Sequence, residues 1–279
     1  MKLNYENLSK KYLNFFENKD RCDFALTDVL FAFEELYDCI NKPSINSILE
    51  IGSGTGILLN EFSKYFPSKK FIGLDPYESG FHNYEDITNE LKKKDNLNFI
   101  KGHLKDFDKK LKFDLIFSFN VFEHVENQLD FVKISYDLLK DGGKKLIFFP
   151  NYDFPYEPHF VIPLIINKSI TYKLFKNRIV KHEAITKEKG LWEGLNFNGK
   201  KKIEKMLHEQ KIEFEFDETI KDKLFQRIKD DQSKYFRKRQ NFVSNLALLS
   251  KKIYLDKLVF NFLKIPFPYL KLIIKKKYE

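Results

Sequence analysis

The residues with the clearest chemical meaning form one short stretch, in which a strand-like segment enters a glycine-rich turn and then a helix-like segment. The stretch runs from Ile48 to Gly56 and reads Ile-Leu-Glu-Ile-Gly-Ser-Gly-Thr-Gly. Its glycines at positions 52, 54 and 56 permit tight backbone geometry and let a ligand approach the main chain closely. The turn therefore predicts a ligand site that is built largely from backbone groups.

The residue types around this turn narrow the class of ligand. A dinucleotide fingerprint would place a glycine where the chain has Ile57, and no Gly-Lys-Ser/Thr sequence follows for a nucleoside triphosphate. Asp75 lies 19 residues after Gly56, at the end of the next strand-like segment. A carboxylate there can accept hydrogen bonds from both ribose hydroxyls of a nucleoside. The loop and the acid together predict a nucleoside cofactor, although Asp75 alone would equally suit NAD.

The elements that position these residues are short apolar strands alternating with helical stretches, a rhythm typical of a parallel sheet. We expect strands at Ser47–Ile51, Lys70–Leu74, Asn98–Lys101, Asp114–Ser118 and Lys145–Phe149. We expect helices at Ile57–Phe66, Asn83–Lys93 and Phe131–Lys140. The last of these helices is followed by Gly142 and Gly143, which indicate a glycine stop at its C-terminus.

The flanking regions have a different pattern. Residues 5–40 carry apolar stripes at helical spacing and predict one or two helices, which end by Pro43. After residues 151–197, which are rich in aromatic residues and proline, we expect a helix at Gly199–Gln210 and strands at Ile212–Phe216 and Tyr269–Lys275. Residues 219–264 are predicted to be helical.

Length and composition limit the number of domains and the cellular location of the protein. The 279 residues, 43% of them hydrophobic, suffice for one large α/β domain with additions or for two small domains. Cys22 and Cys39 are too few for a disulfide framework, which indicates a reducing cytoplasm. The longest apolar run, Phe160–Ile166, is far shorter than the roughly 20 residues of a spanning helix. We therefore expect a cytoplasmic protein that is soluble or peripheral to a membrane.

The glycine turn, with Glu50 two residues upstream, resembles the first motif of class I (Rossmann-like) S-adenosylmethionine-dependent methyltransferases. Residues 113–125, which end in Glu123-His124-Val125, are similar to the fourth-strand motif of the ubiquinone-biosynthesis-like group. Leu138–Pro150 resembles the next motif, a helix followed by a Gly-Gly turn and a strand. The resemblance covers residues 46–151 well and extends weakly beyond them. Such proteins are commonly encoded with surface-polysaccharide genes.

The resemblance implies an α/β fold with a Rossmann-like seven-stranded sheet of order 3-2-1-4-5-7-6. It implies an N-terminal helical cap over residues 1–44 and a methyltransferase domain over residues 45–279. Within that domain, a substrate lid is expected over 151–197, after the fifth strand. A basic helical insertion is expected over 219–264, between the last two strands.

The resemblance also implies S-adenosyl-L-methionine as the cofactor. In the family, the loop backbone holds the methionine part, the acid of the second strand holds the ribose, and the tip of the fourth strand faces the sulfonium. The implied cofactor-binding residues are Glu50, Gly52, Ser53, Gly54, Gly56, Asp75, Pro76, His103, Leu104, Asn120 and Val121. The chain departs from the family at His103, since many members place an aspartate there to meet the adenine amino group.

Two histidines are the candidate catalytic residues. Methyl transfer to a hydroxyl group requires positioning and a proton acceptor, and histidine is suited to the latter at neutral pH. His124 follows the fourth strand by six residues and is the first candidate, although it could instead be a turn histidine bonded to the backbone. Glu123 would orient it or cap the next helix. His159, beyond the fifth strand, is the second candidate, and Tyr156 and Glu157 are weaker ones.

Several other chemistries are disfavoured by the residues present. Methylation of base amines typically uses an Asp/Asn-Pro-Pro-Tyr/Phe sequence after the fourth strand, where this chain reads Asn120-Val121-Phe122-Glu123. C5-methylation of pyrimidines requires a nucleophilic cysteine, but both cysteines lie in the N-terminal helices. Aminopropyl transfer favours an aspartate at the position of Asn120. No metal is expected, since no His/Asp/Glu set has the spacing of metal ligands along the sequence.

The positive charge of the chain is concentrated at its end. Residues 219–279 contain 16 basic and 5 acidic residues, whereas the whole chain has a net charge of +9. Leu246, Leu249 and Ile253 continue an apolar stripe that begins at Phe242. Three interpretations remain open: a solvated helix packed on the domain, a helix on anionic lipid, or an RNA-binding surface. The apolar stripe favours a membrane over nucleic acid.

The sequence-based prediction of function is therefore an O-methyltransferase that acts on a small molecule, a glycan or a lipid-linked sugar, with N-methylation as the lesser alternative. An RNA methyltransferase that uses the basic segment is a second hypothesis. A non-catalytic subunit that binds the cofactor is a third. The intact glycine turn and Asp75 argue against the third hypothesis.

Overall fold

The computed structural model describes residues 1–78, 82–91, 94–186, 188–253, 255–257 and 265–278. Contacts within the chain divide it into two compact units. Unit 1 comprises Met1–Asp38 and Glu218–Phe267, and unit 2 comprises Cys39–Asp217 and Pro268–Glu279. The N-terminal helices and the C-terminal helical segment, which lie at opposite ends of the sequence, therefore belong to the same unit.

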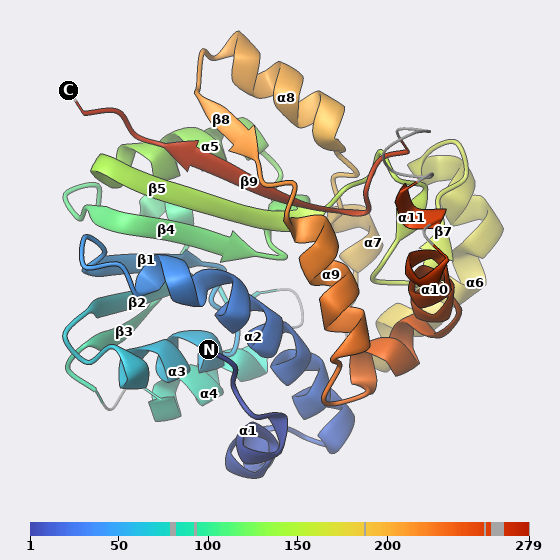
Figure 1. Cartoon of the computed structure of the whole chain (residues 1–279), viewed down its shortest axis with the longest axis horizontal. Helices are drawn as coiled ribbons and strands as arrows, with labels where there is room; N and C mark the ends of the chain where they lie inside the picture. The colour runs from blue at the N-terminus through green and yellow to red at the C-terminus, as the bar shows by residue number, and fades with distance from the viewer. Residues whose placement is uncertain (79–81, 92–93, 187, 254, 258–264, 279) are drawn as a thin grey trace. The chain divides into compact units, whose positions relative to one another are not determined.

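Unit 2 is built on a seven-stranded sheet of order β3-β2-β1-β4-β5-β9-β8 (Figure 1). Its strands are β1 (Ser47–Ile51), β2 (Lys70–Asp75), β3 (Leu97–Lys101), β4 (Phe113–Phe119), β5 (Leu139–Pro150), β8 (Phe214–Phe216) and β9 (Tyr269–Lys275). The first five are parallel, and β9 runs antiparallel to both β5 and β8. In chain order, β8 and β9 are the sixth and seventh strands of this sheet. The predicted order 3-2-1-4-5-7-6 is therefore confirmed.

Helices cover both faces of this sheet. They are α3 (Ile57–Tyr65), α4 (His82–Leu91), α5 (Gln128–Asp137) and α8 (Lys200–Glu209). Helices α3 and α4 lie on one face, and α5 and α8 lie on the other (Figure 1). Val132 of α5 and Leu207 of α8 are fully buried in the same apolar cluster as Ile147 of β5. This packing fixes the carboxyl ends of the parallel strands, where α/β folds bind their ligands. The predicted last residues of the α4 helix, 92 and 93, lie outside the described residues.

The segment after β5 has an apolar core of its own. It contains a short hairpin of β6 (Tyr156–Glu157) and β7 (Ile162–Pro163), followed by α6 (Lys168–Thr186) and α7 (Leu191–Gly194). Phe160 and Trp192 are buried in this core, and their rings meet edge to face. The Asn196 side-chain amide donates a hydrogen bond to the Phe122 carbonyl at 2.8 Å. The segment is thereby attached to the turn that follows β4.

The predicted glycine stop after α5 is wrong. The helix ends at Asp137, and Gly142 and Gly143 lie inside β5. The pairing of β5 with β4 shifts register between Phe113 and Leu115, so the extra residues form an irregularity in the strand. Gly142 has φ +72°, the left-handed conformation that a glycine at a helix end would also adopt. Here this conformation forms part of the irregularity in β5 and does not end a helix.

Unit 1 is helical. Its elements are α1 (Tyr5–Tyr12), η1 (Leu13–Phe15), α2 (Lys19–Ile40), α9 (Ile220–Lys229), α10 (Tyr235–Lys252) and α11 (Leu255–Lys257). Both helical predictions are confirmed for the described residues, but 254 and 258–264 of the predicted insertion lie outside them. Among the described helices, none combines the length and the apolar character that crossing a membrane requires.

Candidate active site

The glycine turn lies between β1 and α3 and has an unusual backbone. Gly52, Gly54 and Gly56 have φ angles of +76°, +49° and +69°, which L-residues rarely adopt. The Gly52 N–H donates to the Leu74 carbonyl of β2 at 2.7 Å. A Cβ atom on Gly52 would lie 2.2 Å from a methyl of Val121, which follows β4. Residue 52 must therefore be glycine, and the turn is in direct contact with the end of β4.

Asp75 ends β2 and is bound to this turn. Its Oδ2 accepts a hydrogen bond from the Gly54 N–H at 2.9 Å, and its Oδ1 accepts one from the Tyr77 N–H at 2.8 Å. Burial raises the pKa of the Asp75 carboxyl, although these two backbone donors oppose the rise. Each oxygen keeps a further lone pair for a ligand. The predicted pairing of the glycine turn with Asp75 is thus present as a direct contact.

Glu50 points its side chain into the protein beneath the turn. It is 4% exposed, and its Oε2 has no hydrogen-bond partner among the described residues. Burial and the neighbouring charge of Asp75 raise the pKa of this carboxyl well above its usual value. A buried polar atom without a partner carries a substantial free-energy cost. Glu50 therefore suits a ligand that brings a hydrogen-bond donor or a positive charge to this place.

The predicted adenine contacts lie at the end of β3. The Gly102 N–H donates to the Asp75 carbonyl at 3.0 Å, which joins the end of β3 to the end of β2, directly before Pro76. His103 is exposed, and its Nε2 lies 3.3 Å from a Glu78 carboxylate oxygen. Leu104 begins the 3-10 turn η2 (Leu104–Asp106). The structure therefore brings these predicted residues to the same sheet edge as Asp75.

The end of β4 contains a contact that the sequence did not predict. Asn120 has φ +54°, and its side-chain Oδ1 accepts a hydrogen bond from the Tyr269 hydroxyl at 2.7 Å. Tyr269 begins β9, the strand after next in the sheet. The two residues are 149 positions apart. No local pattern in the sequence could have indicated this contact.

Both predicted catalytic histidines lie in one cluster. His124 ends the 3-10 turn η3 (Phe122–His124), and His159 follows the hairpin strand β6. Their rings meet edge to face with centroids 5.2 Å apart. His159 Nδ1 lies 2.6 Å from an oxygen of Glu157, and His159 Nε2 lies 3.9 Å from an oxygen of Glu123. We call these four residues the histidine–glutamate cluster.

Burial determines the charge states in the cluster. The pKa of His124 falls to about 3, chiefly because burial disfavours the imidazolium and secondarily because His159 is close. His124 is therefore neutral at physiological pH. Burial alone would raise the pKa of Glu157, but His159 and the backbone N–H of Phe160 outweigh it, so this pKa is lowered. An ionised Glu157 thus orients His159.

Glu157, which the sequence indicated only as a weaker catalytic candidate, is a central residue of the cluster in the structure. Its side chain is 0% exposed and also accepts a hydrogen bond from the Phe160 N–H at 2.7 Å. Glu123 does not cap the next helix, because Asn127 is the N-cap residue of α5; Glu123 is 1% exposed and lies near His159. The signal that could have found Glu157 is its position only two residues before His159, close enough along the chain for its carboxylate to contact the imidazole.

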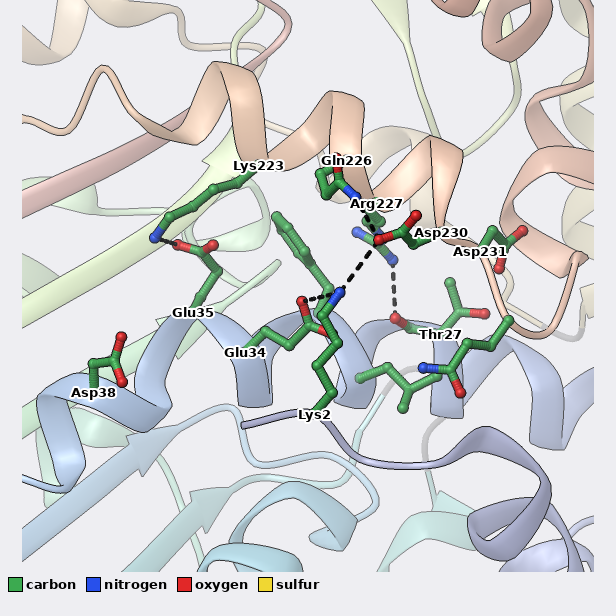
Figure 2. Close-up of a pocket in the computed structure, with 13 residues that line it drawn as sticks. Lys2, Thr27, Glu34, Glu35, Asp38, Lys223, Gln226, Arg227, Asp230 and Asp231 are labelled. Atoms are coloured by element: carbon green, nitrogen blue, oxygen red, sulfur yellow. Dashed lines mark hydrogen bonds and ion pairs between the residues drawn. The ribbon is translucent and has the colours of Figure 1, made fainter.

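A pocket of unit 1 lies between α2 and α9 (Figure 2). Charged residues line it, and its cations are matched by acids. Lys2 lies 3.5 Å from Glu34 and 3.3 Å from Asp230, and Lys223 lies 2.9 Å from Glu35. Arg227 pairs with Asp28 at 2.6 Å and stacks over two phenylalanine rings. Part of the C-terminal positive charge is therefore neutralised inside unit 1.

Comparison with known sequences identifies a domain. Residues 49–144 match the family described as a methyltransferase domain. An uncharacterised protein of Mycobacterium tuberculosis is 31% identical over 163 residues, which are 57% of this chain and 55% of that protein. Malonyl-[acyl-carrier protein] O-methyltransferase 1 of Ilyobacter polytropus is 36% identical over 98 residues, 35% of each chain. The chain thus spans about half the length of the mycobacterial relative.

Comparison with solved structures identifies the fold. The plantazolicin methyltransferase BpumL, in complex with SAH, has a TM-score of 0.51 at 16% identity, over 98% of this chain and 90% of that one. Phosphoethanolamine N-methyltransferase 2 of Haemonchus contortus, in complex with S-adenosyl-L-methionine, has a TM-score of 0.54 at 15% identity, over 96% and 60%. The chain therefore has the fold of class I S-adenosylmethionine-dependent methyltransferases, and residues 49–144 carry the matching domain sequence.

Proposed function

We propose that the protein is an S-adenosylmethionine-dependent methyltransferase that methylates an oxygen atom of a small molecule or glycan, including lipid-linked sugars. One observation carries the proposal: the glycine turn and Asp75 are joined by the Gly54–Asp75 hydrogen bond at the carboxyl edge of the sheet. Both belong to the segment that matches a methyltransferase domain. The histidine–glutamate cluster follows β4 at the same edge.

The residues present fit this cofactor. Glu50 has a buried oxygen without a partner in the described residues, and an amino group of the methionine part would supply the missing donor and positive charge. Gly52, Gly54 and the turn backbone would hold the rest of the methionine part, and Asp75 would accept hydrogen bonds from the ribose. His103 and Leu104 would lie at the adenine. The bound cofactor would supply an electrophilic methyl group on a sulfonium.

The cluster favours oxygen as the acceptor atom. A hydroxyl must lose its proton on methylation, and the cluster offers the imidazole of His159, oriented by Glu157, as a proton acceptor. His124 is the weaker base, because its pKa is lowered to about 3. Val121, which contacts Gly52, precedes Glu123 and His124 by only two and three positions, so the cluster begins beside the cofactor turn. The malonyl-[acyl-carrier protein] relative is named an O-methyltransferase, which supports the same choice. An amine acceptor is the alternative.

The acceptor itself can be found by following the methyl group. Purified protein is incubated with cell extract and S-adenosylmethionine that carries an isotope-labelled methyl group. We expect mass spectrometry to detect a labelled product that is absent when the protein is omitted. A labelled RNA in place of a labelled small molecule or glycan would support the RNA hypothesis instead.

The exposed face of α10 supports a second proposal, peripheral contact with an anionic membrane. Leu246, Leu249 and Ile253 are 51%, 52% and 58% exposed, so this part of the predicted stripe faces solvent in the structure. The side chain of Phe242 lies outside the described residues. Lys238 and Lys252 on the same helix are exposed. Exposed apolar side chains beside lysines are typical of a helix that lies on a membrane surface. A cytoplasmic location, in keeping with two free cysteines, belongs to this proposal.

Vesicle flotation tests the membrane proposal. We expect the protein to float with anionic vesicles at low salt, since each basic residue near such a surface contributes about 1 kcal/mol, and to stay unbound to neutral vesicles. The double variant Leu246→Asp/Leu249→Asp should lose binding, whereas Leu111→Asp, another exposed leucine, should retain it. Wild-type protein that stays in solution with anionic vesicles would make α10 an ordinary part of the scaffold.

A further inference from the structure

The histidine–glutamate cluster has the composition of a metal site as well as that of a proton-transfer site. Glu123, His124 and His159 each direct one ligand atom to a common place, and these atoms lie within 4.8 Å of one another. The residues come from two segments, the η3 turn and the loop after β6. Their separation along the chain explains why spacing in the sequence did not reveal the set.

We propose that Glu123, His124 and His159 bind one divalent transition-metal cation, and that this ion activates the acceptor oxygen of the methyl-transfer reaction. The binding part stands on the geometry of the cluster alone. The role of the ion in catalysis rests on the function proposed above.

The distances in the cluster suit a shared ion. His159 Nε2 and the Glu123 oxygen are 3.9 Å apart, which is too long for a hydrogen bond. Imidazole nitrogens and carboxylate oxygens bind such ions at about 2.0–2.2 Å, so two ligands of one ion lie about 3–4 Å apart. Small side-chain rotations would bring the third ligand atom to the same ion.

Glu157 prepares His159 for this role. Because Glu157 accepts a hydrogen bond from Nδ1 at 2.6 Å, the other ring nitrogen, Nε2, is left with its lone pair directed toward Glu123. Histidines that bind metals commonly donate their second N–H to a carboxylate in this way. The Glu157 side chain is itself held by the Phe160 N–H at 2.7 Å.

The charge of the cluster also favours a cation. Glu123 and Glu157 are 1% and 0% exposed, and His159 lies between them. Burying two carboxylates together is costly unless positive charge accompanies them. A divalent cation supplies this charge without requiring either histidine to be protonated.

Two histidines and one carboxylate indicate which ions would bind. Imidazole ligands favour Zn²⁺, Fe²⁺ or Ni²⁺ over Ca²⁺ and Mg²⁺, and three protein ligands leave positions for water or a substrate oxygen. A hydroxyl group on the ion has a lowered pKa, and its proton would pass to solvent water. Both histidines would then act as ligands, and the ion would replace a side-chain base.

Calorimetry on metal-free protein tests the binding. Protein is dialysed against a chelator and titrated with Zn²⁺ or Ni²⁺ alone. We expect one equivalent to bind to wild type, and affinity to fall at least tenfold in Glu123→Gln and His159→Ala. Glu157→Gln should weaken binding about 10–100-fold through the orientation of His159. The matched controls Glu126→Gln and His208→Ala, both of exposed residues, should bind as wild type does.

A Co²⁺ absorption spectrum and cofactor binding complete the test. Co²⁺ in the wild-type site should show visible bands that His159→Ala lacks, while all variants should still bind S-adenosylmethionine, which verifies that they are folded. No stoichiometric metal binding by wild type, or equal binding by His159→Ala, would overturn the proposal. Metal-free protein with full methyl-transfer activity would overturn the catalytic role and leave the methyltransferase function intact. Loss of that function would show instead as failure to bind the cofactor.

Discussion

Asp75→Ala is expected to reduce the affinity for S-adenosylmethionine by about 100-fold or more, as measured by isothermal titration calorimetry. Each hydrogen bond between a ligand hydroxyl and a charged carboxylate contributes about 1.5–3 kcal/mol, and Asp75 is proposed to make two. The substitution also removes the acceptor for the Gly54 and Tyr77 N–H groups, which hold the glycine turn in place. The lost ribose hydrogen bonds and the loosened glycine turn therefore both reduce the affinity for the cofactor.

Two variants sharpen this experiment. Asp86→Ala removes an exposed acid on the neighbouring helix α4 and should leave the affinity unchanged. Asp75→Asn keeps the shape and one acceptor, so its affinity should lie between those of wild type and Asp75→Ala. An Asp75→Ala protein that binds the cofactor as tightly as wild type does would remove Asp75 from the site.

Replacing either histidine of the cluster is expected to slow turnover by about 10²–10⁴-fold, while the affinity for S-adenosylmethionine stays nearly the same. His124→Ala and His159→Ala remove the groups that activate the acceptor oxygen, but neither residue is proposed to touch the cofactor. The measurement is kcat at saturating acceptor, combined with calorimetry for the cofactor.

His208→Ala is the matched control, because this exposed histidine lies on α8, where its ring packs against that of Phe214 in β8. It should retain wild-type turnover. If His124→Ala had the wild-type kcat at saturating acceptor, His124 would have no part in the mechanism. His159, oriented by Glu157, would then be the remaining candidate for the catalytic residue.

The sequence predicted the central sheet well because its signals are local. Apolar runs such as Ser47–Ile51 and Tyr269–Lys275 have bounds that match β1 and β9 residue for residue. The glycine turn was recognised from residue types alone, since each of its three glycines occupies a backbone conformation that other residues avoid. The strand order followed from the family resemblance.

The sequence predicted less where distant segments meet. Gly142 and Gly143 suggest a helix end, and only the pairing of β5 with β4 shows that they belong to a strand. The contacts of Tyr269 with Asn120 and of His159 with Glu123 depend on the folded chain. The same holds for unit 1, in which ion pairs such as Lys223–Glu35 join the two ends of the sequence. Contacts between residues that are far apart in the chain produce no periodic pattern in the sequence, so they could not be predicted from it.

Methyl transfer from S-adenosylmethionine is tested most directly with a trideuterated methyl group in cell extract, with wild type and Asp75→Ala compared by mass spectrometry. We expect a product heavier than its precursor by one labelled methyl group, with an equal amount of S-adenosylhomocysteine, in the wild-type reaction alone. The proposed function would be contradicted if wild-type protein that binds the cofactor produced neither labelled product nor S-adenosylhomocysteine, or if Asp75→Ala produced both at the wild-type rate.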